Sequence, residues 1–338
     1  MPILLSHNSS LERLRAIPPQ VDRSSIIQAP LELAPFARIG RMRQEMDLRG
    51  LGLLQRPVHL LVPSGKHRSS HAQARTHRCS LDNLPPGLVR QATASAFFCG
   101  PELTFIQMSS ETSLLGSVVL GYELCGSYSH FSQMISGFYD RPALTNVGKL
   151  REAIESVPGI RGVNTARTAL RWIRDGSASP METVVSCMLS LPNEMGGFGM
   201  APPELNYPIR LNKTEATIAG TDSLRIDTAY PESLVGVEFD GKDYHRDAEH
   251  DARRRTALAH RGWTIYVLNV DELVSYPRLK EKIALLDAVP RRPGETKPED
   301  ADAKDLLKRL LAATRCGVGL NAALFGTNVP RNVVTTHL

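Results

Sequence analysis

The chain has 338 residues, of which 42% are hydrophobic, and its formal net charge is +5, so it is long enough for two packed domains and favours polyanionic partners only mildly. Its five cysteines are odd in number and include no C-x-x-C pair, which argues against a disulfide framework and against a structural zinc knuckle. No signal-peptide pattern opens the sequence and no run approaches the roughly 18 apolar residues of a membrane span, so we expect a cytoplasmic protein with no membrane partner.

The first half predicts a mixed α/β domain over residues 1–170, which we expect to recognise a target or a protein partner. Residues 58–62 form a mostly apolar run between two prolines, a pattern typical of a buried strand. Residues 66–78 are polar and basic with serines interleaved, which indicates a loop or hairpin arm. Because basic side chains supply sequence-independent affinity for phosphate backbones, the arm offers four candidate nucleic-acid-binding residues: Lys66, Arg68, Arg75 and Arg78.

Four histidines lie in or near this arm, namely His59, His67, His71 and His77. Their spacing does not match that of a metal site, and we interpret them as structural or solvated histidines.

The second half predicts one domain over residues 177–287. Ser179, Pro180 and Glu182 have the spacing of a helix start, with serine as the cap and proline in the first turn. The apolar pattern then predicts strands at 207–211, 223–229 and 233–239, a helix at 246–260, a strand at 263–269 and a helix at 271–286. Residues 288–338 are expected to form a linker, a short amphipathic helix and a tail.

Three carboxylates occupy related places on this outline. Asp227 lies on a predicted strand, Glu238 ends the next strand, and Glu182 lies on the preceding helix. Two strands joined by a tight turn would place Asp227 and Glu238 side by side at one sheet edge, with Glu182 as a third acid. Mg²⁺ is usually held by one or two carboxylates with waters and substrate phosphate, and it activates water for phosphodiester hydrolysis. The acids therefore predict a Mg²⁺ site, with Mn²⁺ as a substitute.

Each candidate residue also has a structural interpretation. Glu182 could be only a helix cap, and Asp227 could lie on a solvent-facing strand surface, whereas Glu238 follows an apolar run and needs a partner or a metal. His245 could act as a general base or be a solvated histidine. Arg254 shares a helix face with Leu258, so it either pairs with the acids, contacts phosphate or lies on a solvated basic face.

The ordered set of motifs resembles the PD-(D/E)xK nuclease superfamily, and within it the small domains akin to the very-short-patch repair endonuclease. The likeness covers roughly a hundred residues, about 179–272, and rests on Met181-Glu182, Arg225-Ile226-Asp227, Glu238-Phe239-Asp240-Gly241 with His245, Asp251-Ala252-Arg253-Arg254, and Gly262-Trp263 before the last strand. It implies a C-terminal restriction-endonuclease-like mixed sheet flanked by helices. By that resemblance Asp227 and Glu238 bind Mg²⁺, Glu182 and Asp240 assist, and His245 lies at the water side.

One departure from the superfamily concerns its motif lysine, whose position is taken here by Asp240. Lys242, two residues further on, is the candidate to replace it. The resemblance implies a metal-dependent endonuclease that cuts DNA in genome defence or repair. The alternatives are a non-cleaving DNA-binding regulator or antitoxin with a degenerate nuclease fold, and a defence effector that acts on RNA.

Overall fold

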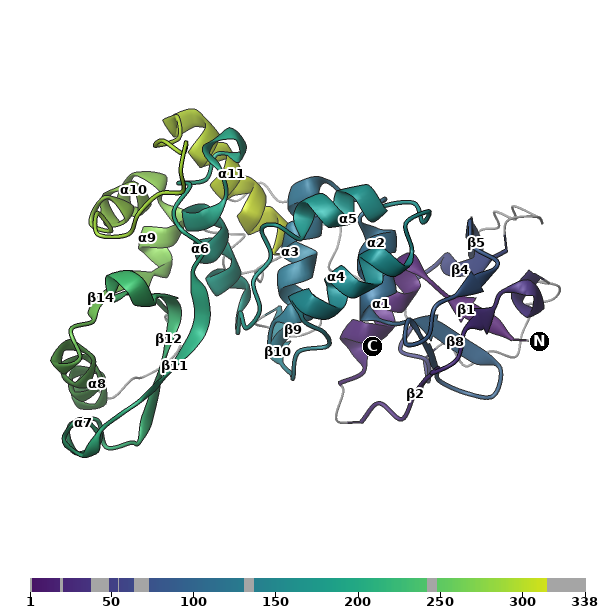
Figure 1. Cartoon of the computed structure of the whole chain (residues 1–338), viewed down its shortest axis with the longest axis horizontal. Coiled ribbons are helices and arrows are strands. Elements are labelled where there is room, and N and C mark those ends of the chain that lie inside the picture. The colour runs from purple at the N-terminus through teal and green to yellow at the C-terminus, as the bar shows by residue number, and fades with distance from the viewer. Residues whose placement is uncertain are drawn as a thin grey trace, which may run out of the picture. The chain divides into compact units, whose positions relative to one another are not determined.

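The computed structural model describes seven stretches of the chain, residues 2–18, 21–37, 49–53, 55–63, 73–130, 137–241 and 248–314. The fold is mixed α/β, as the sequence predicts, and it divides into two compact units (Figure 1). Unit 1 comprises residues 1–129 and 141–176, and unit 2 comprises residues 130–140 and 177–338. Within the described stretches, no helix is both long and apolar enough to cross a membrane.

Unit 1 is built on a six-stranded sheet with the order β2-β7-β8-β1-β4-β5. The sheet is mixed, since β1 runs parallel to β8 and antiparallel to β4, and β4 runs parallel to β5. Its strands are β1 (Ile3–Leu5), β2 (Ser25–Ile26), β4 (Val58–Val62), β5 (Ala74–Arg78), β7 (Val89–Gln91) and β8 (Ala96–Cys99). A separate antiparallel pair is formed by β3 (Leu31–Glu32) and β6 (Asn83–Leu84).

Two predictions for this sheet have different outcomes. All five residues of β4 are buried, which confirms the predicted buried strand. Residues 74–78, expected as part of a loop or hairpin arm, instead form β5 beside β4. Strand β5 is at the end of the sheet order, and only Ala74 among its residues is buried. A polar edge strand of this kind lacks the apolar pattern by which a strand is recognised in sequence.

The helices of unit 1 are α1 (His7–Ala16), α2 (Pro101–Met108), α3 (Leu114–Cys125), α4 (Val147–Ser156) and α5 (Val163–Ala169), with a short 3₁₀ helix at Ala34–Ala37. Helix α1 packs against β4 and α2, and α3 packs against α5. Helix α3 is apolar around most of its circumference, and ten of its 12 residues are buried, as expected for a helix in the interior of a domain.

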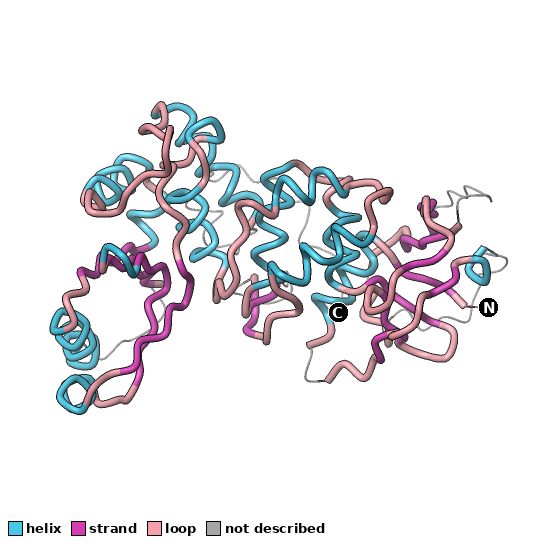
Figure 2. The backbone as a smooth tube through the Cα atoms, viewed as in Figure 1, coloured by secondary structure: helices cyan, strands magenta, loops and turns pink. Residues whose placement is uncertain are grey.

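Unit 2 contains a four-stranded sheet with the order β11-β12-β13-β14. The strands are β11 (Glu204–Arg210), β12 (Ser223–Tyr230), β13 (Val235–Asp240) and β14 (Thr264–Asn269), close to the predicted spans. Strands β11, β12 and β13 are successively antiparallel, whereas β14 runs parallel to β13. A parallel neighbour requires a crossover connection, and α8 (Ala248–His260) lies in it. The mixed sheet flanked by helices is thus confirmed (Figure 2).

The remaining helices of unit 2 are α6 (Pro180–Ser190), α7 (Lys213–Ala219), α9 (Val270–Val274), α10 (Tyr276–Ala284) and α11 (Asp300–Ala313), with 3₁₀ turns at Asn193–Met195 and Pro231–Ser233. The helix expected over 271–286 is two helices, because α10 restarts with a proline in its first turn after an extended Ser275. Helix α11 packs against α6 through buried leucines. Two short strands, β9 (Tyr128–His130) and β10 (Phe138–Asp140), fall near the boundary of the two units along the chain.

The core of unit 2 fixes β12 and β13 beneath α8. Ile226 of β12 is fully buried with Leu258 of α8 and Trp263. Gly236 lies opposite Ala229, and a Cβ at Gly236 would stand 2.7 Å from side-chain atoms of both Ile226 and Ile265. The absence of a side chain at Gly236 therefore allows both isoleucines to pack tightly at this position. This packing holds the two acid-bearing strands in place.

Candidate functional site

Asp227 and Glu238 lie on the neighbouring antiparallel strands β12 and β13. The β12–β13 ladder ends with Thr228 opposite Val237, so Asp227 and Glu238 occupy the next opposing positions. Opposing residues of an antiparallel pair project to the same face. Beyond the end of the ladder, the two strands are joined by a hydrogen bond to a side chain: the Phe239 amide donates to Asp227 Oδ2 at 3.0 Å. The carboxylate of Asp227 therefore reaches the strand that carries Glu238.

Glu182 approaches the same strands from α6, which packs against both β12 and β13. Ser179 Oγ accepts a hydrogen bond from the Glu182 amide at 3.1 Å, which confirms the predicted helix start. The Glu182 side chain is buried, and its Oε2 accepts hydrogen bonds from the Ala178 amide and from Asn206 Nδ2, each at 2.8 Å. The carboxylate thus stabilises the local chain turn as well as lying beside the sheet.

Electrostatics links Glu182 to Asp227. Burial raises the pKa of the Glu182 carboxyl to about 7, and the nearby Asp227 carboxylate adds to the rise, against the hydrogen bonds that Glu182 accepts. Two ionised carboxylates at low dielectric repel each other, and the repulsion is relieved by a proton or by a cation between them. The pair is therefore a place where a bound cation would be favoured.

Glu238 has a different partner. Its Oε1 accepts a hydrogen bond from Arg254 Nη2 in an ion pair, and the same nitrogen donates to the carbonyl oxygen of Arg225. Both side chains are largely buried, so this is a compensated carboxylate rather than a solvated one. The sequence left three interpretations of Arg254 open, and the structure shows the one in which Arg254 pairs with an acid. The buried Leu258, four residues on, confirms the shared helix face.

The acids do not meet as a single triad. Among the described residues, the group of three potential ligands whose atoms all lie within 4.8 Å of one another does not involve Glu182, Asp227 or Glu238. Asp240 is the last residue of β13, half-buried and opposite Asn269 of β14. Lys242 and His245 lie outside the described residues. Carboxylate oxygens such as those of Glu182 and Asp227 are the ligand type by which proteins usually hold Mg²⁺, with one or two carboxylates per ion.

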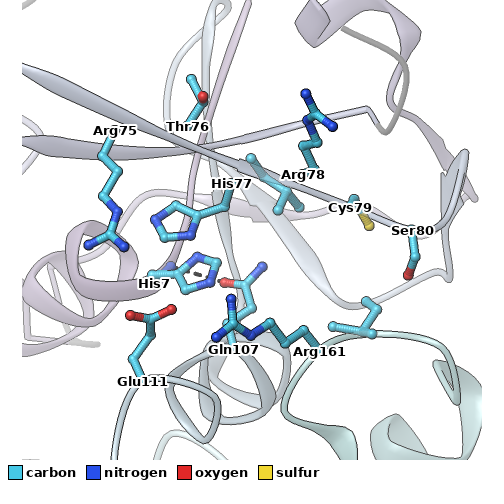
Figure 3. A pocket seen from close by; sticks show the side chains of 12 residues that line it. His7, Arg75, Thr76, His77, Arg78, Cys79, Ser80, Gln107, Glu111 and Arg161 are labelled. Carbon is cyan, nitrogen blue, oxygen red and sulfur yellow. Dashed lines mark hydrogen bonds between the residues drawn. The ribbon is translucent and has the colours of Figure 1, made fainter. Parts of the chain in front are cut away.

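Of the four basic residues predicted in the arm, the structure describes two. Lys66 and Arg68 lie outside the described residues, whereas Arg75 and Arg78 are exposed on β5. Both line a pocket of about 390 Å³ in unit 1 (Figure 3). The pocket also contains side chains that were not predicted as functional, namely His7, His77, Gln107, Glu111 and Arg161.

Two of the four histidines considered in the sequence, His59 and His77, lie together with His7 beside this pocket, whereas His67 and His71 lie outside the described residues. The rings of His7 and His77 are stacked, with centroids 3.5 Å apart and an interplanar angle of 18°. His77 Nε2 and His59 Nδ1 are 2.9 Å apart in a hydrogen bond. The histidines meet because β1, which leads to His7, and β5, which carries His77, both flank β4, which carries His59.

His7 is held in an uncommon backbone conformation. Its φ is 47°, in the left-handed region that costs a residue other than glycine roughly 1–2 kcal/mol. Its amide donates to the buried Gln107 Oε1 at 3.0 Å, and its ring Nδ1 lies 3.1 Å from Ser6 Oγ. Strained residues held by surrounding contacts occur often at functional sites, and this one directs an imidazole into the pocket (Figure 3).

Burial keeps these imidazoles neutral. It lowers the pKa of His7 to about 2, and the neighbouring His77, His59 and arginines lower it further. Burial also lowers the pKa of His77 to about 4, with His59, Arg75 and Arg161 as further causes. The pKa of His59 is lowered as well, mainly by burial. Neutral imidazole is the form that binds metals.

No protein-family model, curated protein or solved structure matches this chain. Function is therefore inferred from the sequence and from two clusters of side chains, the acids of unit 2 and the histidine pocket of unit 1.

Proposed function

We propose that unit 2 is a metal-dependent nuclease domain that hydrolyses phosphodiester bonds in DNA. The observation that carries this proposal is the approach of Glu182, from α6, to Asp227, at the point where the ladder between β12 and β13 ends in a side-chain hydrogen bond. Glu238 follows on the opposing strand. Carboxylates from a helix and two strands thus lie at one end of the β12–β13 pair.

The order of elements supports the proposal. The resemblance to PD-(D/E)xK nucleases implies a helix with a glutamate, two acid-bearing strands, a helix with an arginine and a last strand. Helix α6, strands β12 and β13, helix α8 and strand β14 follow in that order, and the first four carry Glu182, Asp227, Glu238 and Arg254, respectively. His245 lies outside the described residues.

Glu182 and Asp227 would hold the metal ion, with Mn²⁺ able to take the same oxygen donors as Mg²⁺. When bound, such an ion activates water and offsets charge on the scissile phosphate. Arg254 neutralises Glu238 and thereby limits the negative charge that an incoming phosphate meets. Asp240, at the end of β13, is the candidate to assist.

A second function is favoured by a specific observation. Glu238 is already paired with Arg254, and the motif lysine position holds Asp240. A domain with these features could bind DNA without cutting it, as a regulator or antitoxin.

The experiment is cleavage of supercoiled plasmid, single-stranded DNA and RNA by the full chain with Mg²⁺ or Mn²⁺. Asp227→Asn should abolish metal-dependent cutting, and Glu182→Gln should reduce it strongly. The matched control is Asp222→Asn, because Asp222 is an exposed acid immediately before β12. DNA binding by wild type without cutting in either metal would reject the nuclease and favour the regulator, while cutting confined to RNA would reassign the substrate.

A further inference from the structure

We propose that unit 1 carries a metal site of its own, in which His7, His77 and Glu111 bind a divalent transition-metal ion of the zinc class. All three residues belong to unit 1, so the site is separate from the acids of unit 2 and does not depend on the proposed nuclease. One ring nitrogen from each histidine and one carboxylate oxygen of Glu111 lie within 4.8 Å of one another.

The donor set and spacing suit this class of ion. Zinc binds histidine nitrogens and carboxylate oxygens at roughly 2.0–2.2 Å, so ligand atoms around one ion stand roughly 3 to 4 Å apart. Because a ring nitrogen binds a metal ion in the plane of its ring, the stacked rings of His7 and His77 must turn out of the stack when the ion binds. Glu111 is exposed and turned towards His7 (Figure 3). Two histidines and a glutamate form a known catalytic zinc ligand set, which leaves a coordination position open.

The hydrogen bonds of the histidines leave a suitable nitrogen on each ring. His77 uses Nε2 towards His59 Nδ1, and His7 uses Nδ1 towards Ser6 Oγ. When those nitrogens carry the protons, Nδ1 of His77 and Nε2 of His7 present lone pairs. Metal-binding histidines are usually oriented in this way, by a hydrogen bond from the ring nitrogen that does not bind the ion.

The backbone brings the ligands together from distant parts of unit 1. His7 follows β1 in its left-handed conformation, His77 lies opposite Leu61 in the β4–β5 ladder, and Glu111 follows α2. Gly162 fits against the end of α2, where a Cβ would stand 2.1 Å from the Ile106 carbonyl oxygen. This close approach places Arg161 in the same pocket as Glu111.

The arginines indicate what occupies the open position. Arg75 and Arg161 lie near enough to act electrostatically on His7 and His77, and they would oppose a bare cation. One carboxylate and one divalent ion leave a net charge of about +1, to which the arginines add. We infer that the ion takes an anionic ligand, and that phosphate is a suitable probe because arginine binds phosphate in a fork geometry.

The test is Zn²⁺ binding to the full, untagged chain after chelator treatment, measured by titration calorimetry and by metal analysis. Wild type should bind one Zn²⁺ at this site. Glu111→Gln should lower the affinity by more than about 100-fold, beyond the usual effect of losing a group that only orients a ligand. Because Glu111 is exposed, this variant should fold, and the exposed Glu155 on α4 gives the matched control Glu155→Gln.

Two outcomes of this titration would overturn the proposal. One is wild-type affinity in Glu111→Gln, since the ion would then be held by other residues. The other is no Zn²⁺ binding by wild type. Asp227→Asn should bind Zn²⁺ normally, so that loss of cleavage in unit 2 and loss of metal in unit 1 are read separately.

Co²⁺ substitution tests the ligand type. With nitrogen and oxygen ligands the visible spectrum should lack a thiolate charge-transfer band, and His77→Gln should abolish the spectrum. A thiolate band would reject the assignment, because Cys79 also lines the pocket as a buried thiol. Circular dichroism of His77→Gln checks that its fold is retained, and Glu111→Gln must give the same loss.

Phosphate tests the anionic ligand. Saturating inorganic phosphate should raise the Zn²⁺ affinity of wild type by about tenfold or more, and Arg161→Gln should remove this gain while it keeps Zn²⁺ binding. An affinity for Zn²⁺ that phosphate leaves unchanged would overturn the inferred anionic ligand.

Discussion

Burial shifts the pKa of key side chains in both units, but in opposite directions. In unit 1 burial keeps histidines in their neutral form by lowering the pKa of His7 to about 2, and in unit 2 burial and a like charge raise the pKa of Glu182 to about 7. Burial always favours the uncharged form, but that form is deprotonated for histidine and protonated for glutamate. Acidification should therefore destabilise unit 1 and stabilise the Glu182 region of unit 2.

The chain offers a way to follow the units separately. It contains two tryptophans, Trp172 in unit 1 and Trp263 in unit 2. Trp263→Phe leaves a fluorescence reporter of unit 1, and Trp172→Phe leaves one of unit 2. Unfolding by urea at each pH in these two backgrounds reports the stability of each unit.

The largest effect is expected in unit 1 below pH 6.5. His7 has a pKa of about 2 in the folded chain and 6.5 as its ordinary value, so its contribution to stability is full above pH 6.5 and falls as the pH drops. Between pH 6.5 and 4 the loss should be on the order of 3 kcal/mol from His7 alone. His7→Asn should flatten this dependence, since asparagine tolerates a left-handed backbone. Equal slopes in wild type and His7→Asn would contradict the prediction.

The next effect concerns the compensated acid of unit 2. Arg254→Leu removes this ion pair from Glu238 and should lower the free energy of unfolding by about 3 kcal/mol, as for other broken buried pairs. The neighbouring Arg253 pairs with Glu249 in the open, both more than half exposed, so Arg253→Leu should change stability by less than about 1 kcal/mol. Equal effects of the two substitutions would show that the Glu238–Arg254 pair is not effectively buried.

A smaller and opposite effect is expected at Glu182. Its pKa is raised from 4.5 to about 7, so metal-free unit 2 should lose stability as the pH rises from about 4.5 to 7. Glu182→Gln removes the buried charge and its repulsion with Asp227, and should stabilise metal-free unit 2 at pH 8 by roughly 2–3 kcal/mol. Mg²⁺ should stabilise wild type more than Glu182→Gln, and a variant less stable than wild type at pH 8 would contradict the repulsion.

The smallest effect is the loss of the α6 cap. Ser179→Ala removes the acceptor for the Glu182 amide and should cost about 1 kcal/mol in unit 2. Asn212→Ala removes the equivalent cap of α7 and serves as the comparison. If the cap positions Glu182, Ser179→Ala should also weaken Mg²⁺ binding and Asn212→Ala should not. Equal Mg²⁺ affinity in the two variants would show that the Ser179 cap stabilises only its own helix.

The sequence predicted most elements of unit 2 because their signals are local. Ser179 and Pro180 mark the start of α6, and Gly262 precedes the strand after α8. The break between α9 and α10 was missed, although Pro277 was visible, because the apolar spacing continues across it. The pairing of Glu238 with Arg254 was one of the alternatives already open.

The histidine pocket could not be predicted in the same way. His7, His77 and Glu111 are far apart in the chain, and they meet only through the strand order β1-β4-β5 and the packing of α2 near β8. None of those pairings has a local signature, and β5 itself is polar. A left-handed conformation at His7 also has no signal in sequence, and the hydrogen bond that its amide donates to Gln107 Oε1 joins residues a hundred positions apart.

The hydrogen bond from the Phe239 amide to Asp227 Oδ2 has a consequence for how mutants are interpreted. A buried amide that loses its acceptor lowers the free energy of unfolding by about 1–3 kcal/mol. Asp227→Ala would therefore remove a metal ligand and the hydrogen bond that holds the strand end at the same time. Asparagine keeps an acceptor oxygen at the same reach. Asp227→Asn therefore changes the charge without changing the shape, and it separates the loss of a metal ligand from the loss of the hydrogen bond that holds the strand end.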